Sequence, residues 1–286
     1  MFPSNTGMSI DMFTVKLSFM SLLLLLLLSW FNPLRAQSLS KVTSSENHFK
    51  TGEELDFKLS YGWFTLGKAH ANITSELIAY NGILSYQVQV SGTTSGIIGV
   101  FTDVNDNWGA YINSKSLKPI HTYKHLQEGN YERIAKTNFL FEEGLATVEK
   151  WNPQKIIRKP IDTFDIAKTD WDFLSAYLNL RNIQFDKLSV GDSISINTFY
   201  EREFYPIIIE YGGKDVFKSK VGKLEAHKLH VVMQSNEIFP QERGIVVYVS
   251  ADENHLPLRI EAEMFFGKAY CDLVSYRNIK YGPNFQ

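Results

Sequence analysis

Five side chains of this sequence are candidates for general acid–base chemistry: Asp103, Asp106, His121, Glu132 and Asp172. A hydrolase or transferase would need two carboxylates, or a histidine with a carboxylate, to converge in one cleft. The spacing of these residues along the chain sets no such distance. Asp172 also stands near the start of a helical pattern, where capping of the helix explains a carboxylate more simply. Catalysis is therefore the alternative to a binding function rather than the first interpretation.

The sequence lacks the motifs that would indicate nucleotide binding, a reactive cysteine or a zinc site. Neither a Gly-x-x-x-x-Gly-Lys-Ser/Thr loop nor a Gly-x-Gly-x-x-Gly turn between strand and helix is present, which argues against a nucleotide. Cys271, the single cysteine, lies in a strand-like apolar run that favours a buried, inert thiol. His121 and His125 would lie about 13 Å apart along a strand, too far to share one zinc ion. We therefore expect no cofactor and no metal.

Two arginines are candidates for holding an anion. Arg181 and Arg259 each follow a strongly apolar run, and a charge in such a place usually needs a partner. Asp172 or Asp252 could be that partner, in which case the ion pair locks the helix to the sheet. The alternative is an arginine that binds an anion at the mouth of a cavity.

Aromatic side chains are the other candidates for ligand binding, because they stack on sugars and pack on acyl chains. Core packing is the default role of each. Trp63 and Phe64 are the exception, because they lie at the tip of a turn and could contact a membrane surface or an envelope protein. The candidate ligand-binding residues are Trp63, Trp108, Tyr123, Trp171, Tyr177, Arg181 and Arg259.

The elements that must position these residues are mostly strands. Leu55, Phe57 and Leu59 alternate with polar residues, which is the period of a half-buried strand. Turn signals such as Asn81-Gly82 recur every 10–14 residues or so, roughly the spacing that is typical of sandwiches and barrels. Residues 170–183 instead place their apolar side chains on one helical face. We predict a mainly β fold, with a large antiparallel sheet or sheets forming a sandwich or half-barrel around one central helix.

The start of the chain predicts export. Lys16 precedes an apolar run from Leu17 to Phe31, and Ala36 stands before Gln37, which is the layout of a secretory signal. The run is shorter than the ~20 residues of a membrane-spanning helix, although an uncleaved anchor is the alternative. We expect a periplasmic or surface protein, soluble or peripheral. The expected parts are a signal peptide at 1–36, a flexible lead-in at 37–48 and a single β-rich domain at 49–286, which could comprise two β halves joined near 162–190.

The composition excludes some partners and constrains stability. The chain has 286 residues and a net charge of -2, with no basic run that could neutralise many phosphates, so a nucleic-acid partner is not expected. One cysteine excludes an intramolecular disulfide, and 44% of the residues are hydrophobic. Stability must therefore come from a large core.

The order of several short motifs carries a family resemblance. Tyr61-Gly62-Trp63-Phe64 comes first, Trp171 to Tyr177 with Leu180-Arg181 follows, and Val249 to Asp252 precedes Leu256-Pro257-Leu258-Arg259-Ile260. Across most of the mature chain this order resembles an exported bacterial family known as domain of unknown function 3108. The resemblance implies export and a mainly β fold, and it supplies no catalytic residues.

Two classes of function stay open. The first is an envelope protein that binds an apolar or amphipathic ligand, such as a lipid or a glycan, without catalysis. The alternatives are a hydrolase or transferase that acts on envelope glycans or lipids, and a scaffold that contacts an envelope protein through Trp63 and Phe64. An enclosed cavity with apolar and aromatic walls favours the first class, and convergent carboxylates favour the enzyme.

Overall fold

The computed structural model describes residues 37–95, 103–155, 160–232, 243–264 and 267–284, so the expected signal peptide at 1–36 lies outside the described residues. Its strands in the first half are β1 (Gln37–Ser38), β2 (Glu54–Tyr61), β3 (Phe64–Ile73), β4 (Ile78–Tyr80), β5 (Ile83–Thr94), β6 (Asn105–Asn113), β7 (Pro119–Glu128), β8 (Tyr131–Leu140), β9 (Leu145–Trp151) and β10 (Asp162–Asp165). Its strands in the second half are β11 (Ser193–Tyr200), β12 (Glu203–Lys218), β13 (Lys223–Val232), β14 (Ile245–Ser250), β15 (Pro257–Met264) and β16 (Gly267–Arg277). Its helices are α2 (Leu39–Val42), α4 (Phe173–Arg181) and the 3-10 turn η1 (Phe185–Lys187).

One sheet contains all 16 strands of the described residues. The order is β1-β11-β12-β13-β14-β15-β16-β2-β3-β5-β6-β7-β8-β9-β10, and β4 pairs with β5. The short pairing of β1 with β11 is parallel, whereas the long ladders, such as β16 with β2, are antiparallel. Because β16 lies beside β2, the two halves of the chain form one continuous sheet.

The strands form where apolar and polar residues alternate. In β6, Trp108, Ala110 and Ile112 are buried, whereas Asn105 and Asn107 are exposed. Successive side chains of a strand point to opposite faces, so this pattern gives β6 one face toward the core and one toward solvent.

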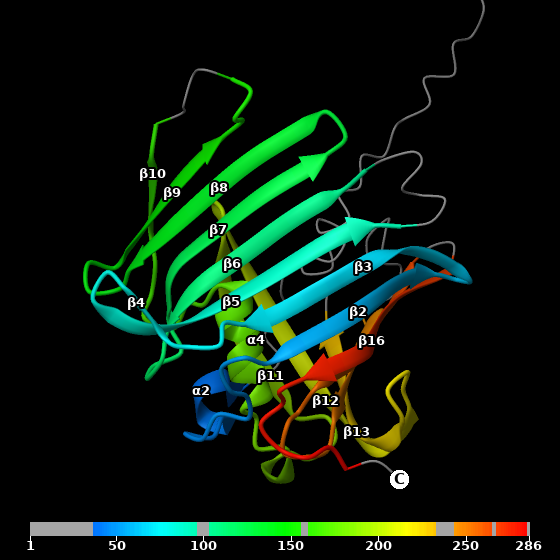
Figure 1. Ribbon diagram of the computed structural model, residues 1–286. Helices are drawn as coiled ribbons and strands as arrows, with labels where there is room; N and C mark the ends of the chain where they lie inside the picture. The colour runs from blue at the N-terminus through cyan, green and yellow to red at the C-terminus, as the bar shows by residue number, and fades with distance from the viewer. Residues whose placement is uncertain (1–36, 96–102, 156–159, 233–242, 265–266, 285–286) are drawn as a thin grey trace, which may run out of the picture.

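The sheet curls back on itself around the central helix. In Figure 1, β11 and β12 pass behind the broad surface of β5 to β8, and α4 lies between the two layers. The main core fills the same space with Ile112 of β6, Leu178 of α4 and Ile194 of β11. The predicted mainly β fold with a large antiparallel sheet and one helix is confirmed, and the open, curled sheet matches the half-barrel rather than the sandwich.

Helix α4 is shorter than the predicted 170–183 because a capping box fixes its start. The Asp172 side chain accepts hydrogen bonds from the N–H groups of Leu174 at 2.8 Å and Ser175 at 3.1 Å, and Ser175 Oγ accepts one from the Asp172 N–H. Arg181 ends the helix, where a cation complements the helix dipole. Asp172 therefore has a structural role at the first turn.

The structure differs from the flexible lead-in expected at 37–48. Strand β1 pairs with Ile194 and Ser195 of β11, and α2 places Leu39 and Val42 in the main core. The two apolar side chains are three positions apart, so one short helical turn directs both inward. The surrounding serines and threonines hide this pattern in the sequence.

Candidate functional site

The two edges of the curled sheet meet without a ladder of backbone hydrogen bonds. Phe199 of β11 packs edge-on against Phe139 of β8, with ring centroids 6.2 Å apart, and against Phe164 of β10 at 5.4 Å. The described strand order ends at β10 on one side and at β1 and β11 on the other. We call this contact of Phe199 with Phe139 and Phe164 the seam. Side-chain packing, rather than strand pairing, holds it together.

A pocket lies beside the seam, between the inner faces of β6 to β8, the start of α4 and the end of β11. Trp108, Phe173, Phe199 and Tyr200 supply aromatic walls. The cavity volume is about 40 Å³, which holds about three waters. Sites for drug-sized ligands are roughly ten times larger. In this state the pocket therefore accommodates a head group rather than a whole lipid.

Three cations converge on one carboxylate at the polar end of this pocket. Glu201, in the turn after β11, pairs with Lys124 of β7, with Arg133 of β8 at 2.7 Å and with Lys150 of β9 at 2.5 Å. Lys124 also donates a hydrogen bond to the hydroxyl of Tyr200. We call Lys124, Arg133, Lys150 and Glu201 the seam cluster, since it joins both edges of the sheet.

Burial and neighbouring charges shift the pKa values of the seam cluster in opposite directions. Burial lowers the pKa of Lys124, which is 6% exposed, to about 8, although the charge of Glu201 opposes this shift. Burial alone would raise the pKa of Glu201, but the positive charges of Lys124 and Arg133 outweigh it and lower the pKa to about 2. At neutral pH the cluster holds one negative charge and three positive charges.

The pocket brings together only part of the residues that were predicted to bind a ligand. Trp108 lines it. The ring of Tyr123 instead stacks on His121 on the opposite face of β7, and Trp171 packs under the ammonium group of Lys118 at 3.2 Å. Trp63 is 86% exposed at the β2–β3 turn, far from any core, as the turn-tip interpretation expected.

Sequence reasoning missed the seam cluster and Tyr200. One signal was available, because Lys124 occupies an inward position of β7 between Thr122 and Leu126. A lysine at such a position needs a partner or a ligand. Its partner is in a turn 77 residues later in the chain, so no local pattern could identify it.

The five acid–base candidates do not share one cleft. Glu132 pairs with His125, and His121 contacts Asn138; both lie on the sheet face opposite Lys124. Asp103 is exposed, and Asp106 is buried and accepts the N–H of Gln127. Asp172 alone lines the pocket, and it caps α4.

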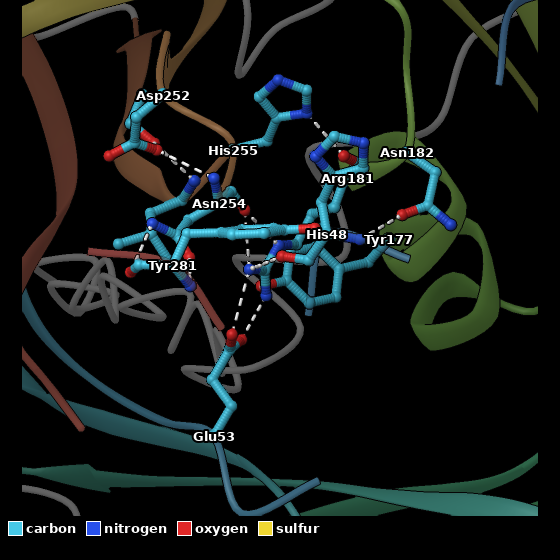
Figure 2. Close-up of polar contacts among 11 residues, drawn as sticks. His48, Glu53, Tyr177, Arg181, Asn182, Asp252, Asn254, His255 and Tyr281 are labelled. Carbon is cyan, nitrogen blue, oxygen red and sulfur yellow. Dashed lines mark hydrogen bonds and ion pairs between the residues drawn. The ribbon is translucent and has the colours of Figure 1, made fainter. Parts of the chain in front are cut away.

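Figure 2 shows that Arg181 belongs to a separate cluster of polar contacts, away from the seam cluster. Its guanidinium group pairs with both carboxylate oxygens of Glu53, which immediately precedes β2, and donates to the carbonyl oxygens of Asn254 at 2.7 Å and His48 at 3.0 Å. Tyr177 packs beside it, with its hydroxyl 3.5 Å from Nη1. Arg181 and Glu53 are each 2% exposed. The donors of Arg181 are used inside the protein, so the arginine locks the helix to the sheet.

The partners predicted for the two arginines were wrong. Asp252 bonds to Ser250 and to the Asn254 N–H, and Asp172 lies at the opposite end of α4 from Arg181. Arg259 pairs with Asp272, its direct neighbour across β15 and β16, at 2.6 Å. The fold pairs each arginine with a different acid, Glu53 for Arg181 and Asp272 for Arg259. A structural ion pair was nevertheless one of the two roles expected for these arginines.

Two buried histidines lie beside the Arg181 cluster. His255 contacts the backbone carbonyl oxygen of Arg181 at 2.6 Å through Nδ1. His227 stacks on Phe185, with ring centroids 4.0 Å apart, and lies 6.1 Å from His255. Burial lowers the pKa of each histidine from 6.5 to about 4. Both rings are therefore neutral in the folded protein at physiological pH.

Stability should fall as the pH drops below about 6.5. The unfolded chain protonates His227 and His255 near pH 6.5 and the folded chain only near 4, so the unfolded state binds more protons within this window. We expect a loss of about 2 kcal/mol between pH 7.5 and 5.5, measured by urea unfolding. Replacing both histidines by glutamine should flatten this dependence, whereas His70→Gln, at a half-exposed site, should not. An unchanged slope in the double variant would contradict the assignment.

Within the described ranges, no group of three or more His, Cys, Asp or Glu side chains is arranged to hold a metal ion. None of the helices in the same ranges is long and apolar enough to cross a membrane.

Comparisons with known proteins identify a family and a fold. The model of the family described as "Protein of unknown function (DUF3108)" matches residues 56–274. A β-barrel-like protein of the domain of unknown function DUF1849 from Brucella abortus is 9% identical, with 81% of this chain and 98% of that chain covered and a TM-score of 0.52. A candidate lipoprotein from Parabacteroides distasonis is 10% identical, with 82% and 100% covered and a TM-score of 0.32. No curated protein matches the chain.

Proposed function

The chain belongs to DUF3108, a family whose function is unknown, and we propose that it is an exported envelope protein that binds an amphipathic molecule at the seam pocket. The observation that carries this proposal is the composition of the pocket. Aromatic rings of Trp108, Phe173 and Phe199 form one part of its wall, and Lys124 and Glu201 form the other. An amphipathic molecule matches both parts.

The seam offers a route for the apolar part of such a molecule. The pocket itself has the size of a head group, so an acyl chain must extend along the seam or widen it. Separating Phe199 from Phe139 and Phe164 breaks aromatic packing but no strand ladder. Widening the seam therefore costs side-chain contacts while the sheet keeps its backbone hydrogen bonds.

The state of the pocket's carboxylates favours binding over catalysis. Glu201 is held ionised by its three cations, so it is a poor general acid at neutral pH. Both oxygens of Asp172 accept N–H groups of the first helical turn. Burial raises the pKa of Asp172, but its two oxygens are already occupied as the cap of α4. The leader-like segment at 1–36 supports the exported location.

Amphiphile binding should depend on the pocket and not on the exposed turn. We expect the full chain to bind one molecule of dodecyl phosphate or dodecyl maltoside in native mass spectrometry. Phe173→Ala should weaken this binding at least tenfold, because the side chain contributes part of the apolar wall. Trp63→Ala removes a larger ring from the exposed β2–β3 turn and serves as the control.

Two results would sink the proposal. One is an absence of bound amphiphile in the wild-type protein at millimolar probe. The other is an equal loss in Phe173→Ala and Trp63→Ala, provided that circular dichroism shows both variants folded.

A further inference from the structure

The seam cluster carries more positive charge than its structural role requires. Joining the two sheet edges needs one cation for Glu201, yet Lys124, Arg133 and Lys150 all contact it. Like charges at this distance repel one another, and Lys124 is nearly buried. No other carboxylate among the described ion pairs is shared by three cations. With the charge of Glu201 set against one of the three cations, the seam cluster has an excess of two positive charges.

Donors in the cluster are left over after Glu201 is satisfied. Arg133 Nε is buried and has no hydrogen-bond partner among the described residues. Lys150 has three N–H donors and contacts Glu201 through one of them. The hydroxyl groups of Thr122 and Thr137, which face each other across β7 and β8, line the same pocket. Lys124 and the two threonines thus line the pocket itself, and Arg133 and Lys150 lie next to it through their contacts with Glu201, which also lines it.

Three further acids lie near the cluster: Asp106 of β6 and Glu128 of β7 on the inner face, and Asp172, which lines the pocket and caps α4. Asp106 of β6 is buried, and its Oδ1 accepts the N–H of Gln127. The register places Leu126 between Asp106 and Arg133. The described ion pairs of the three cations nevertheless all go to Glu201, so the excess of two positive charges belongs to the seam cluster itself.

We propose that the seam cluster binds a phosphate group, with Arg133 and Lys150 as its principal donors. A phosphate monoester or free phosphate supplies two negative charges near neutral pH, which match the excess of the cluster. The guanidinium fork and the ammonium groups are the donors that phosphate oxygens prefer. The head-group size of the pocket fits this ligand. Where the phosphate is the head group of an amphiphile, this inference rests on the amphiphile binding proposed above.

Three probes separate the sources of the phosphate. Inorganic phosphate tests the anion alone, dodecyl phosphate tests anion and chain together, and dodecyl maltoside tests the chain with an uncharged head. Calorimetric titration of the full chain should give at least tenfold tighter binding of dodecyl phosphate than of dodecyl maltoside. Equal affinity for inorganic and dodecyl phosphate would assign the site to free phosphate, which still supports the inference.

The Arg133→Gln/Lys150→Gln double variant tests the residues. Both side chains are about a quarter exposed, and Lys124 stays with Glu201, so the variant keeps one ion pair across the seam. It should lose at least tenfold in affinity for both phosphates and stay within twofold for dodecyl maltoside. Lys136→Gln, on the opposite face of β8, is the matched control and should change neither affinity.

Different results would contradict the phosphate site and the proposed amphiphile binding. Equal affinity of wild type and double variant for dodecyl phosphate, or no preference of the wild type for either phosphate, overturns the phosphate site while amphiphile binding stands. Phosphate binding that depends on Arg133 and Lys150, without binding of either amphiphile chain, overturns the proposed function and leaves the phosphate site in place.

Discussion

Arg181→Ala should lower the free energy of unfolding by about 3–5 kcal/mol, because it leaves the buried carboxylate of Glu53 without its cation. The substitution also removes the hydrogen bonds to the carbonyl oxygens of Asn254 and His48, which connect the end of α4 to two loops. Urea unfolding at pH 7.5, followed by circular dichroism, measures the loss.

Arg277→Ala is the matched control, since Arg277 pairs with Glu54, the next residue after Glu53. That ion pair is exposed, with 54% of the Arg277 side chain accessible, so its loss should cost far less than the loss of Arg181. Equal losses in the two variants would mean that Arg181 does not lock the helix to the sheet. Replacing Arg181 and Glu53 together by methionine should recover part of the stability, because no buried charge is then left unpaired.

Phe199→Ala should cost about 3–5 kcal/mol as well, since it opens a cavity at the seam. The ring is 1% exposed and packs against Phe139 and Phe164. Backbone hydrogen bonds do not join β11 to β8 or β10, so aromatic packing closes the seam together with the ion pairs of Glu201 and Arg202. Hydrogen exchange should therefore accelerate in β10 and in β11 around the bridge of Thr198 to Trp171, in addition to the loss measured by urea unfolding.

Phe204→Ala provides the comparison for this effect. Phe204 lies next to Phe199, with ring centroids 5.0 Å apart, but it is 41% exposed. Its removal leaves little cavity and should cost about 1 kcal/mol or less. A cost for Phe199→Ala as small as this, or exchange rates in β10 that stay unchanged, would contradict the closure of the seam by aromatic packing.

Local features of the fold were predictable from sequence, whereas contacts between distant strands were not. Alternation in segments such as Trp108 to Ile112 predicts strands, and the spacing of Phe173, Ala176 and Tyr177 predicts the helix. The neighbouring positions of β16 and β2 leave no local signal, because the chain ends meet only in the folded sheet. The same limit explains why the half-barrel and the sandwich could not be distinguished.

The partners of the buried charged residues were even less predictable from the sequence. The apolar surroundings of Arg181 indicate that it needs an acid, but Glu53 lies 128 residues earlier in the chain. Lys124, Arg133 and Lys150 come from three successive strands, and Glu201 comes from a turn beyond the helix. Only the register of the strands and the curl of the sheet bring these four side chains together.

A crystal structure of the full chain with dodecyl phosphate tests amphiphile binding at the seam most directly. The predicted result is a phosphate within hydrogen-bond distance of Arg133 and Lys150, with the dodecyl chain against Phe173 and Phe199. A ligand at saturating concentration that lies on the exposed Trp63 turn, or elsewhere outside the seam pocket, would contradict it.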